Sequence, residues 1–383
     1  MNFSKLTAYL DSFYNDKNIP GAGCAVYYKR KPVYEHYAGF SNVEKKIKFG
    51  ADTIFKLYSA TKISTCIAVL QLWENGRIDI DNAVSEYIPE YADMTILHTL
   101  PDGSTEIRSA QTPLTIRHLL SMQGGVGDIN TPEVERLVKD LNGKGSTLEL
   151  VKALAKRPLF FEPGSHFRYS SCHDVLAGLV EAVTGKRFGD YLKENIFDPL
   201  GMRDTAFSPK DESRTAPIYN GFDAKTGAAK SIGETFNLNP SAEYESGGGG
   251  LYSIVSDYIL IAEALCNYGL GANGARILKR ETVNQMRANQ LNENNLRDFE
   301  AFGGASKFGY GYGLGVRTLI NREKNNSLSQ NGEFGWDGAR GCYVLADPES
   351  EVAIFYAQQE GGSEWWFWHG TVRNYVYASI WQD

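Results

Sequence analysis

Segments with a strand pattern lie at both ends of this chain, and a long helical stretch separates them. Near the N-terminus, residues 22–28 and 33–40 are predicted as two strands joined by a basic turn. Near the C-terminus, residues 310–317, 339–347 and 352–358 are predicted as further strands. If strands from both ends of the chain pair in one sheet, the middle of the chain folds as an insertion between them.

Helical spacing of apolar residues predicts helices at 3–14, 59–74, 115–122, 147–155, 173–184, 188–196, 256–268 and 279–290. The last segment, 372–381, fits either a helix or a strand. We therefore expect an α/β domain from residues 1–78 and 245–383, with an antiparallel sheet flanked by helices. A mainly helical domain, residues 79–244, is inserted into it.

Composition narrows the class of protein. The chain has 383 residues, of which 42% are hydrophobic and 22% charged, as is typical of a globular protein. Its net charge of −7, without a basic cluster, predicts no nucleic-acid partner. No apolar run is long enough to span a bilayer, so we expect no membrane anchor. The polar N-terminus lacks a secretory signal and the 5 cysteines are scattered, so we expect reduced thiols and a cytoplasmic location.

Several well-known catalytic patterns are absent from the sequence. It contains no G-x-S-x-G, H-E-x-x-H, phosphate-binding loop or C-x-x-C, which argues against nucleophile-elbow hydrolases, zincins and nucleotide-binding loop enzymes. None of the 6 histidines is spaced for a metal. We expect neither a metal nor a cofactor.

The tetrapeptide Ser59-Ala60-Thr61-Lys62 is the one Ser-x-x-Lys in the chain. By itself it also fits an ordinary helix start with Ser59 as the N-cap. Its context favours chemistry, because it joins a strand-like segment to the N-terminus of an apolar helix, where developing negative charge is stabilised. Lys62 then lies one turn along the same helix face as Ser59. A serine hydroxyl is a weak nucleophile until a base takes its proton, and Lys62 is placed to help.

Two further segments are candidates. Tyr169-Ser170-Ser171 precedes a predicted helix, where a tyrosine packed beside a capping serine is the plainer interpretation. Residues 334–341 form a glycine-rich entry to a strand, which alone would be only a turn; small residues there would let a ligand approach the backbone.

Taken in order, these three segments resemble the motifs of the serine β-lactamase-like superfamily, which includes class C β-lactamases, D-Ala-D-Ala carboxypeptidases and family VIII carboxylesterases. The resemblance covers most of the chain. Supporting stretches are residues 115–121, 199–202, 247–253, 257–258 and 308–315. It implies an α/β domain and a helical domain, with the active site in the cleft between them.

The resemblance also implies roles for residues. Ser59 would be the acylated nucleophile, Lys62 its partner on the helix, and Tyr169 the base that takes the serine proton. The backbone N–H groups of Ser59 and Ala339 would form an oxyanion hole. The substrate would be bound by Ser171, Trp336, Asp337, Gly338 and Arg340.

Two departures from the family pattern narrow the function. Ser171 stands where β-lactamases usually have an asparagine, so a side-chain amide donor is missing. Trp336 stands where a lysine or histidine usually helps to hold a substrate carboxylate, and Arg340 is the nearby cation that would attract an anion. In both departures, and in the missing secretory signal, the sequence resembles the family VIII carboxylesterases.

We therefore expect a serine hydrolase that forms an acyl-enzyme and acts on small carboxylic esters. The alternatives are amide hydrolysis of the β-lactamase or D-Ala-D-Ala carboxypeptidase type, acyl transfer, and a binding protein that is acylated without turnover. Residues 208–243 and 291–307 are predicted as loops that set specificity. The aromatic residues 365–368 fit either a substrate pocket or core packing.

Overall fold

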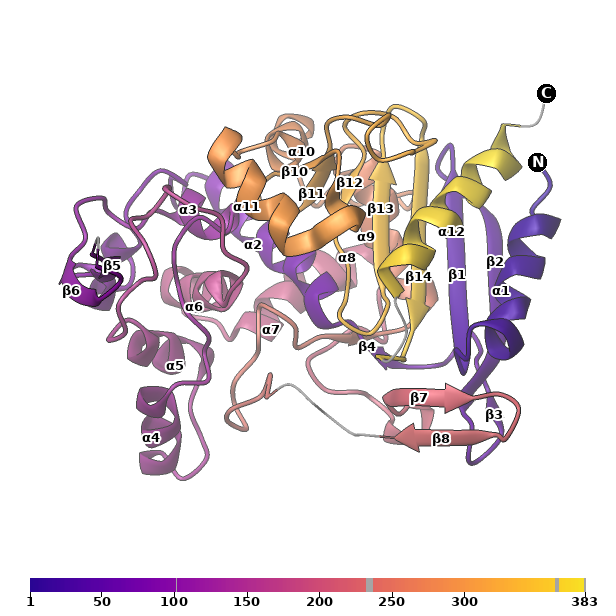
Figure 1. Cartoon of the computed structure of the whole chain (residues 1–383), viewed down its shortest axis with the longest axis horizontal. Coiled ribbons are helices and arrows are strands. Elements are labelled where there is room, and N and C mark those ends of the chain that lie inside the picture. Colours follow the sequence, from indigo (N-terminus) through magenta and orange to yellow (C-terminus); the bar gives the residue numbers. More distant parts are fainter. Residues whose placement is uncertain (101, 232–236, 362–364, 382–383) are drawn as a thin grey trace.

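An antiparallel sheet built from both ends of the chain forms one side of the structure, and the helical part forms the other (Figure 1). The structure is a computed structural model that describes residues 1–100, 102–231, 237–361 and 365–381, with the backbone alone at 365–367. The 8 strands run in the order β10-β11-β12-β13-β14-β1-β2-β3. Their bounds are β1 (Gly21–Tyr28), β2 (Lys31–Asn42), β3 (Ile47–Lys48), β10 (Tyr310–Tyr312), β11 (Arg317–Leu319), β12 (Phe334–Gly335), β13 (Tyr343–Asp347) and β14 (Val352–Gln358).

The N-terminal and C-terminal parts of the sheet meet where β1 pairs with β14. Ala22 lies opposite Gln358 and Tyr28 opposite Val352 in this antiparallel pair. Successive side chains of β1 alternate between two apolar layers, because side chains of a strand point to opposite faces in turn. Cys24 belongs to one buried cluster and Ala25 to the other. The sheet is therefore buried on both faces at β1 and β14, whereas β2 and β3 are mostly half-buried or exposed.

Helices cover the two faces. On one face lie α1 (Ser4–Asp16) and α12 (Trp365–Ile380), and on the other lies α9 (Val255–Cys266), as Figure 1 shows. Leu6, Leu10 and Phe13 recur along α1 at helical spacing and are buried against the first face. On the opposite face the ring of Tyr258 in α9 lies 5.3 Å from that of Phe355 in β14.

Between this sheet and the helical part of the molecule lies α2 (Thr61–Glu74), whose residues from Thr61 to Leu72 are all buried. A helix that is buried all round needs neighbours on every side, and α6 and α7 are among them. The helices of this part are α3 (Ile116–Leu120), α4 (Pro132–Asp140), α5 (Thr147–Leu154), α6 (Cys172–Thr184), α7 (Phe188–Leu192) and α8 (Asp198–Leu200), with a π-helical turn at Lys193–Phe197.

The remaining elements are short. Two hairpins, one small two-stranded pair and two helices complete the chain: β5 (Thr95–Thr99) with β6 (Thr105–Ser109), β7 (Tyr219–Asp223) with β8 (Ala228–Ser231), β4 (Phe55–Lys56) with β9 (Tyr252–Ser253), α10 (Arg280–Arg287) and α11 (Glu293–Gly303). The β7–β8 hairpin lies against the β2–β3 end of the sheet, where the Tyr219 hydroxyl donates to Glu44 at 2.5 Å. No described helix combines the length and the apolar character that crossing a membrane requires.

The predicted fold class is confirmed, whereas the domain boundaries stay a prediction. One predicted strand is wrong: residues 310–317 form two strands, β10 and β11, rather than one. Between them the N–H of Gly313 donates to the carbonyl of Val316, and Gly315 has a φ of +87°. This conformation is open to glycine at little cost, so the chain turns here instead of continuing.

The stretch 291–307 is also not the predicted loop, because it contains α11 and a 3-10 turn, Gly304–Lys307. The side chain of Asn292 accepts a hydrogen bond from Asn295 N–H and caps the helix. Leu296 and Phe299 supply its apolar face, with Phe299 fully buried. At the C-terminus, the segment predicted as a helix or a strand is the second half of α12.

Close packing of α5 on α6 gives a test of the fold. A methyl group at Gly178 of α6 would lie 2.4 Å from Cγ2 of Val151 in α5. We expect Gly178→Ala to lower the free energy of unfolding by about 1–2 kcal/mol, because overpacking outweighs the helix propensity that alanine gains. In a Val151→Ala background the same change is expected to be neutral or stabilising in urea denaturation. An equal loss in both backgrounds would contradict this packing.

Candidate active site

Ser59 lies in a tight turn between β4 and α2. The residue before it, Tyr58, has a φ of +48°, a conformation that non-glycine residues rarely adopt. Ser59 belongs to a 3-10 turn, Tyr58–Ala60, and the helix proper begins at Thr61. Its side chain does not cap α2, so the plainer interpretation of Ser59 as an N-cap fails. The strained turn instead presents the half-buried hydroxyl at the edge of a pocket.

Lys62 contacts the Ser59 hydroxyl from the first turn of α2. Its Nζ lies 3.3 Å from Ser59 Oγ and donates to the carbonyl of Gly248 at 2.5 Å. The side chain is only 4% exposed. A buried ammonium group needs such polar partners, and these two fix its position beside the hydroxyl.

The Gly248 carbonyl is held in place by Asp174, on the first turn of α6. One carboxylate oxygen, Oδ1, accepts from the Tyr244 hydroxyl at 2.7 Å, the Ser246 hydroxyl at 2.7 Å and the Gly248 N–H at 3.2 Å. A methyl group at Gly247 would lie 2.4 Å from the His173 carbonyl, so the glycine run allows this loop to approach α6. Sequence reasoning noticed the glycine run but not Asp174.

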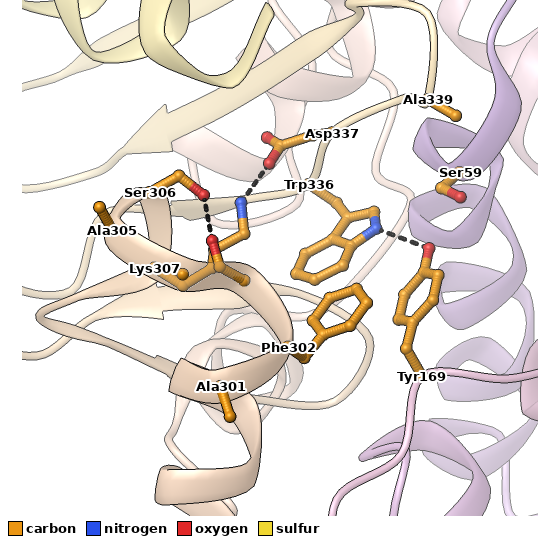
Figure 2. A pocket seen from close by; sticks show the side chains of 12 residues that line it. Ser59, Tyr169, Ala301, Phe302, Ala305, Ser306, Lys307, Trp336, Asp337 and Ala339 are labelled. Atoms are coloured by element: carbon orange, nitrogen blue, oxygen red, sulfur yellow. Dashed lines mark hydrogen bonds and ion pairs between the residues drawn. The ribbon is translucent and has the colours of Figure 1, made fainter. Parts of the chain in front are cut away.

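Tyr169 faces Ser59 as part of an aromatic stack (Figure 2). Its ring stacks with that of Phe302, at 4.8 Å, and with that of Trp336, at 5.6 Å, with nearly parallel planes in both pairs. Trp336 Nε1–H donates to the Tyr169 hydroxyl at 3.1 Å. Lys62 Nζ lies 4.7 Å from the centre of the Tyr169 ring. The structure thus brings Ser59, Lys62, Tyr169 and Trp336 together.

The carboxylate of Asp337 points away from Ser59 (Figure 2). It forms ion pairs with Lys307 Nζ and with Arg317 Nη1, the latter at 2.8 Å. Burial by itself would raise the pKa of Asp337, but the charges of Arg317 and Lys307 outweigh burial and hold the pKa well below its usual range. Asp337 is therefore a fixed anion in the pocket wall.

Ala339 follows on the loop that runs past Ser59 (Figure 2). Among the described residues, neither the Ala339 N–H nor the Ser59 N–H has a hydrogen-bond acceptor. A methyl group at Gly338 would lie 2.3 Å from the Leu57 carbonyl, so glycine lets this loop approach the strand that leads to Ser59. Ser59 and Ala339 line the same pocket, and unpaired N–H groups are the donors that an oxyanion site uses.

Ser171 and Arg340, both predicted to bind the substrate, lie behind the pocket. The Ser171 hydroxyl accepts from the Ile129 N–H at 3.0 Å. Arg340 is buried, and its carbonyl accepts from the Glu360 N–H. Neither residue lines the pocket. Of the aromatic cluster at 365–368, Trp368 packs on Phe13 of α1, and the other side chains lie outside the described residues.

The pocket beside Ser59 has a volume of about 530 Å³. Apolar groups dominate its lining, and Phe302, 49% exposed, stands at its rim. It is lined by Ser59, Tyr169, Trp336, Asp337, Ala339 and the whole stretch from Ala301 to Lys307. The sequence predicted the stretch from Ala301 to Lys307 only as part of a loop. The spacing of Leu296 and Phe299 was the signal for the helix α11. Nothing in the sequence near Lys307 indicated that it pairs with Asp337. In the described part of the chain, no group of His, Cys, Asp or Glu is arranged to bind a metal.

Known proteins resemble this chain over most of its length. A family model described as "Beta-lactamase" matches residues 6–365. Esterase EstB of Burkholderia gladioli is 29% identical over 285 residues, which cover 68% of this chain and 69% of EstB. A putative D-alanyl-D-alanine carboxypeptidase of Escherichia coli is 27% identical over 356 residues, covering 86% of this chain and 74% of that protein. The solved structure of EstCE1, described as a hydrolase with promiscuous acyltransferase activity, has the same fold, with a TM-score of 0.78 at 24% identity over 98% of each chain.

The role of Asp174 in holding the glycine loop can be tested by stability. We expect Asp174→Ala to lower the free energy of unfolding by about 2–4 kcal/mol, because buried donors of Tyr244, Ser246 and Gly248 lose their acceptor. Asp174→Asn keeps an oxygen there and should cost about 1 kcal/mol. The control, Asp140→Ala on the exposed end of α4, should stay within about 0.5 kcal/mol of wild type in urea denaturation. A fully stable Asp174→Ala protein would rule out this role.

Proposed function

The chain belongs to the beta-lactamase family, and on that premise we propose that it is a serine hydrolase that forms an acyl-enzyme on Ser59 and acts on small carboxylic esters. One observation carries the proposal: the Ser59 hydroxyl lies 3.3 Å from the Lys62 ammonium group at the edge of a largely apolar pocket. A nucleophile beside a basic side chain, with room for an acyl group above it, is the arrangement that acyl transfer to serine needs.

In this mechanism Ser59 Oγ attacks the ester carbonyl carbon while Tyr169, acting as the phenolate, takes the hydroxyl proton and becomes the neutral phenol. The N–H groups of Ser59 and Ala339 receive the oxyanion of the tetrahedral intermediate, which then expels the alkoxide. The proton passes from Tyr169 to the leaving alcohol. A water molecule repeats the sequence on the acyl-enzyme and releases the acid. Trp336 Nε1–H holds the Tyr169 oxygen in position, and Lys62 places positive charge beside both groups.

The lining of the pocket favours esters over β-lactams or peptides. Trp336 provides a ring where a cation would attract a substrate carboxylate, and the charge of Lys307 is already paired with Asp337. Ser171 is engaged with Ile129 instead of facing the pocket. EstB is named as an esterase, which agrees with this preference. Amide hydrolysis remains the alternative within the family.

Acyl transfer is a second candidate. A pocket of about 530 Å³ falls within the range of pockets that bind drug-sized ligands, so an acyl group and a small acceptor alcohol can occupy it together. EstCE1, which shares the fold, is described as having promiscuous acyltransferase activity. Adding a primary alcohol to the ester assay distinguishes the two outcomes by the product formed.

The nucleophile is tested by labelling. We expect a fluorophosphonate to add once to the intact protein, at Ser59, and p-nitrophenyl butyrate to be hydrolysed far faster than a chromogenic cephalosporin. Ser59→Ala should lose both the adduct and turnover, whereas Ser208→Ala, at an exposed serine, should keep both. Mass spectrometry detects the adduct, and steady-state assays measure turnover. One adduct without repeated turnover would instead indicate a protein that is only acylated.

The base and its hydrogen bond are tested together. Tyr169→Phe should lower kcat by about 10²–10⁴, because the proton acceptor is lost. Trp336→Phe keeps a ring in the stack but removes the Nε1–H donor, and should lower kcat by about 2–10-fold. Trp381→Phe, at an exposed tryptophan, is the matched control. Near-normal activity of Tyr169→Phe would show that Lys62 alone takes the proton.

A further inference from the structure

A second cavity, here called the inner cavity, lies directly behind the wall of the ester pocket. Its volume is about 190 Å³. It shares Ala305, Ser306, Lys307 and Asp337 with the ester pocket. The Lys307–Asp337 ion pair in Figure 2 therefore belongs to both spaces. In contrast to the apolar ester pocket, much of the surface of the inner cavity is polar.

Cations outnumber anions around the inner cavity. Lys307, Arg317 and Arg373 line it, against the single carboxylate of Asp337. Glu333, which does not line the cavity, lies 3.5 Å from Arg317 Nη2 and supplies a second carboxylate. Burial lowers the pKa of His369, another lining residue, to about 4, so this ring adds no charge at neutral pH. In the described part of the chain, these three cations and two carboxylates leave one positive charge over.

Of the described cations that line this cavity, Arg373 is the one that forms no direct ion pair, and Glu333 acts on it only from a distance. Arg317 uses its terminal nitrogens on Asp337, Glu333 and a backbone carbonyl. Arg373 donates from Nη1 to Tyr310 and Asn325 and from Nε to Asn374, which are all neutral. Among the described residues no carboxylate lies within ion-pair distance of Arg373, and its Nη2 has no acceptor. A methyl group at Gly370, another lining residue, would lie 3.9 Å from that Nη2.

A second unused donor belongs to the same cavity. Tyr343 lines it, is only 3% exposed, and its hydroxyl has no hydrogen-bond partner in the described structure. A buried hydroxyl without a partner costs free energy unless a ligand or water satisfies it. Its ring is held between the Arg317 guanidinium, 4.6 Å away, and His369. An unpaired hydroxyl and an unpaired guanidinium nitrogen around one small cavity match the two oxygens of an anion.

We propose that the inner cavity binds a carboxylate group, held by Arg373 and Tyr343, and that it extends the ester pocket into a subsite for substrates with a distal carboxylate. A monoanion fits better than a phosphate dianion, because only one positive charge is left over and Asp337 would repel a second negative charge. The proposal for substrates rests on the esterase function proposed above, whereas carboxylate binding itself does not. It assigns a task to an arginine and a tyrosine that the hydrolytic mechanism does not use.

Binding is tested without turnover, in Ser59→Ala protein, by titration calorimetry with adipate and with its neutral diamide. We expect adipate to bind and the diamide not to bind. Arg373→Gln should weaken adipate binding by about 10–100-fold and Tyr343→Phe by about 10-fold, because each loses a donor to a charged group. Arg136→Gln, the same change on exposed α4, should bind adipate like the parent. The Tyr343 hydroxyl has no hydrogen-bond partner among the described residues, so we expect Tyr343→Phe to fold. This variant therefore still tests the proposal if Arg373→Gln does not fold.

Ester assays test whether the carboxylate bound in the inner cavity belongs to a substrate or to a free acid. We compare kcat/KM for p-nitrophenyl hydrogen adipate, which has a distal carboxylate, with kcat/KM for p-nitrophenyl hexanoate, which has none. We expect the ratio of the two to exceed the ratio of their rates of alkaline hydrolysis. In Arg373→Gln the enzymatic ratio should fall about 10-fold. No adipate binding, or binding that both variants retain, would overturn the proposal. Binding that the variants lose, with an unchanged ester ratio, would overturn the substrate subsite and leave a site for a free carboxylate. Binding without any ester turnover would overturn the esterase function alone.

Discussion

The ammonium group of Lys62 joins the start of α2 to the glycine loop, which lies 186 residues further along the chain. It belongs to α2, contacts the turn before that helix through Ser59, and binds the glycine loop through the carbonyl of Gly248. Asp174 ties the same loop to α6. Removing a charge of this kind from water is costly, so its two oxygen partners must be placed accurately. The helix, the loop and the strained turn at Tyr58 are therefore fixed relative to one another before any substrate arrives.

Charge and apolar surface are kept apart around this point. The Lys307–Asp337 pair separates a mostly apolar pocket beside Ser59 from a polar cavity behind it. Within the pocket, Tyr169, Trp336 and Phe302 stack their rings and leave few polar atoms for water. Electrostatic interactions at the serine are stronger where water is excluded. The same ion pair thus borders two adjacent cavities with different chemical environments.

The sequence was informative wherever the argument depended on local spacing. Ser59 and Lys62 are one helical turn apart, and the strand pattern at both ends of the chain predicted the fold class that the structure confirms. Spacing alone could not show that Ser171 turns toward Ile129, or that the Asp337 carboxylate pairs with Lys307 and Arg317. These partners are 20 or more residues apart in the sequence and meet only in the folded chain. The helix α11 was missed because its short apolar face, Leu296 and Phe299, is interrupted by polar residues.

The pairing of β1 with β14 also governs how the chain can be made. Ala22 leaves the ribosome 336 residues before its partner Gln358, so the edge of β1 that pairs with β14 stays open while all of the intervening chain is made. Contacts this distant along a chain slow folding, and an open apolar edge invites pairing with other chains. The helical middle can form its local contacts meanwhile, whereas the sheet cannot close. A nascent chain that stops before β14 is therefore a candidate for chaperone capture or aggregation rather than a partly working enzyme.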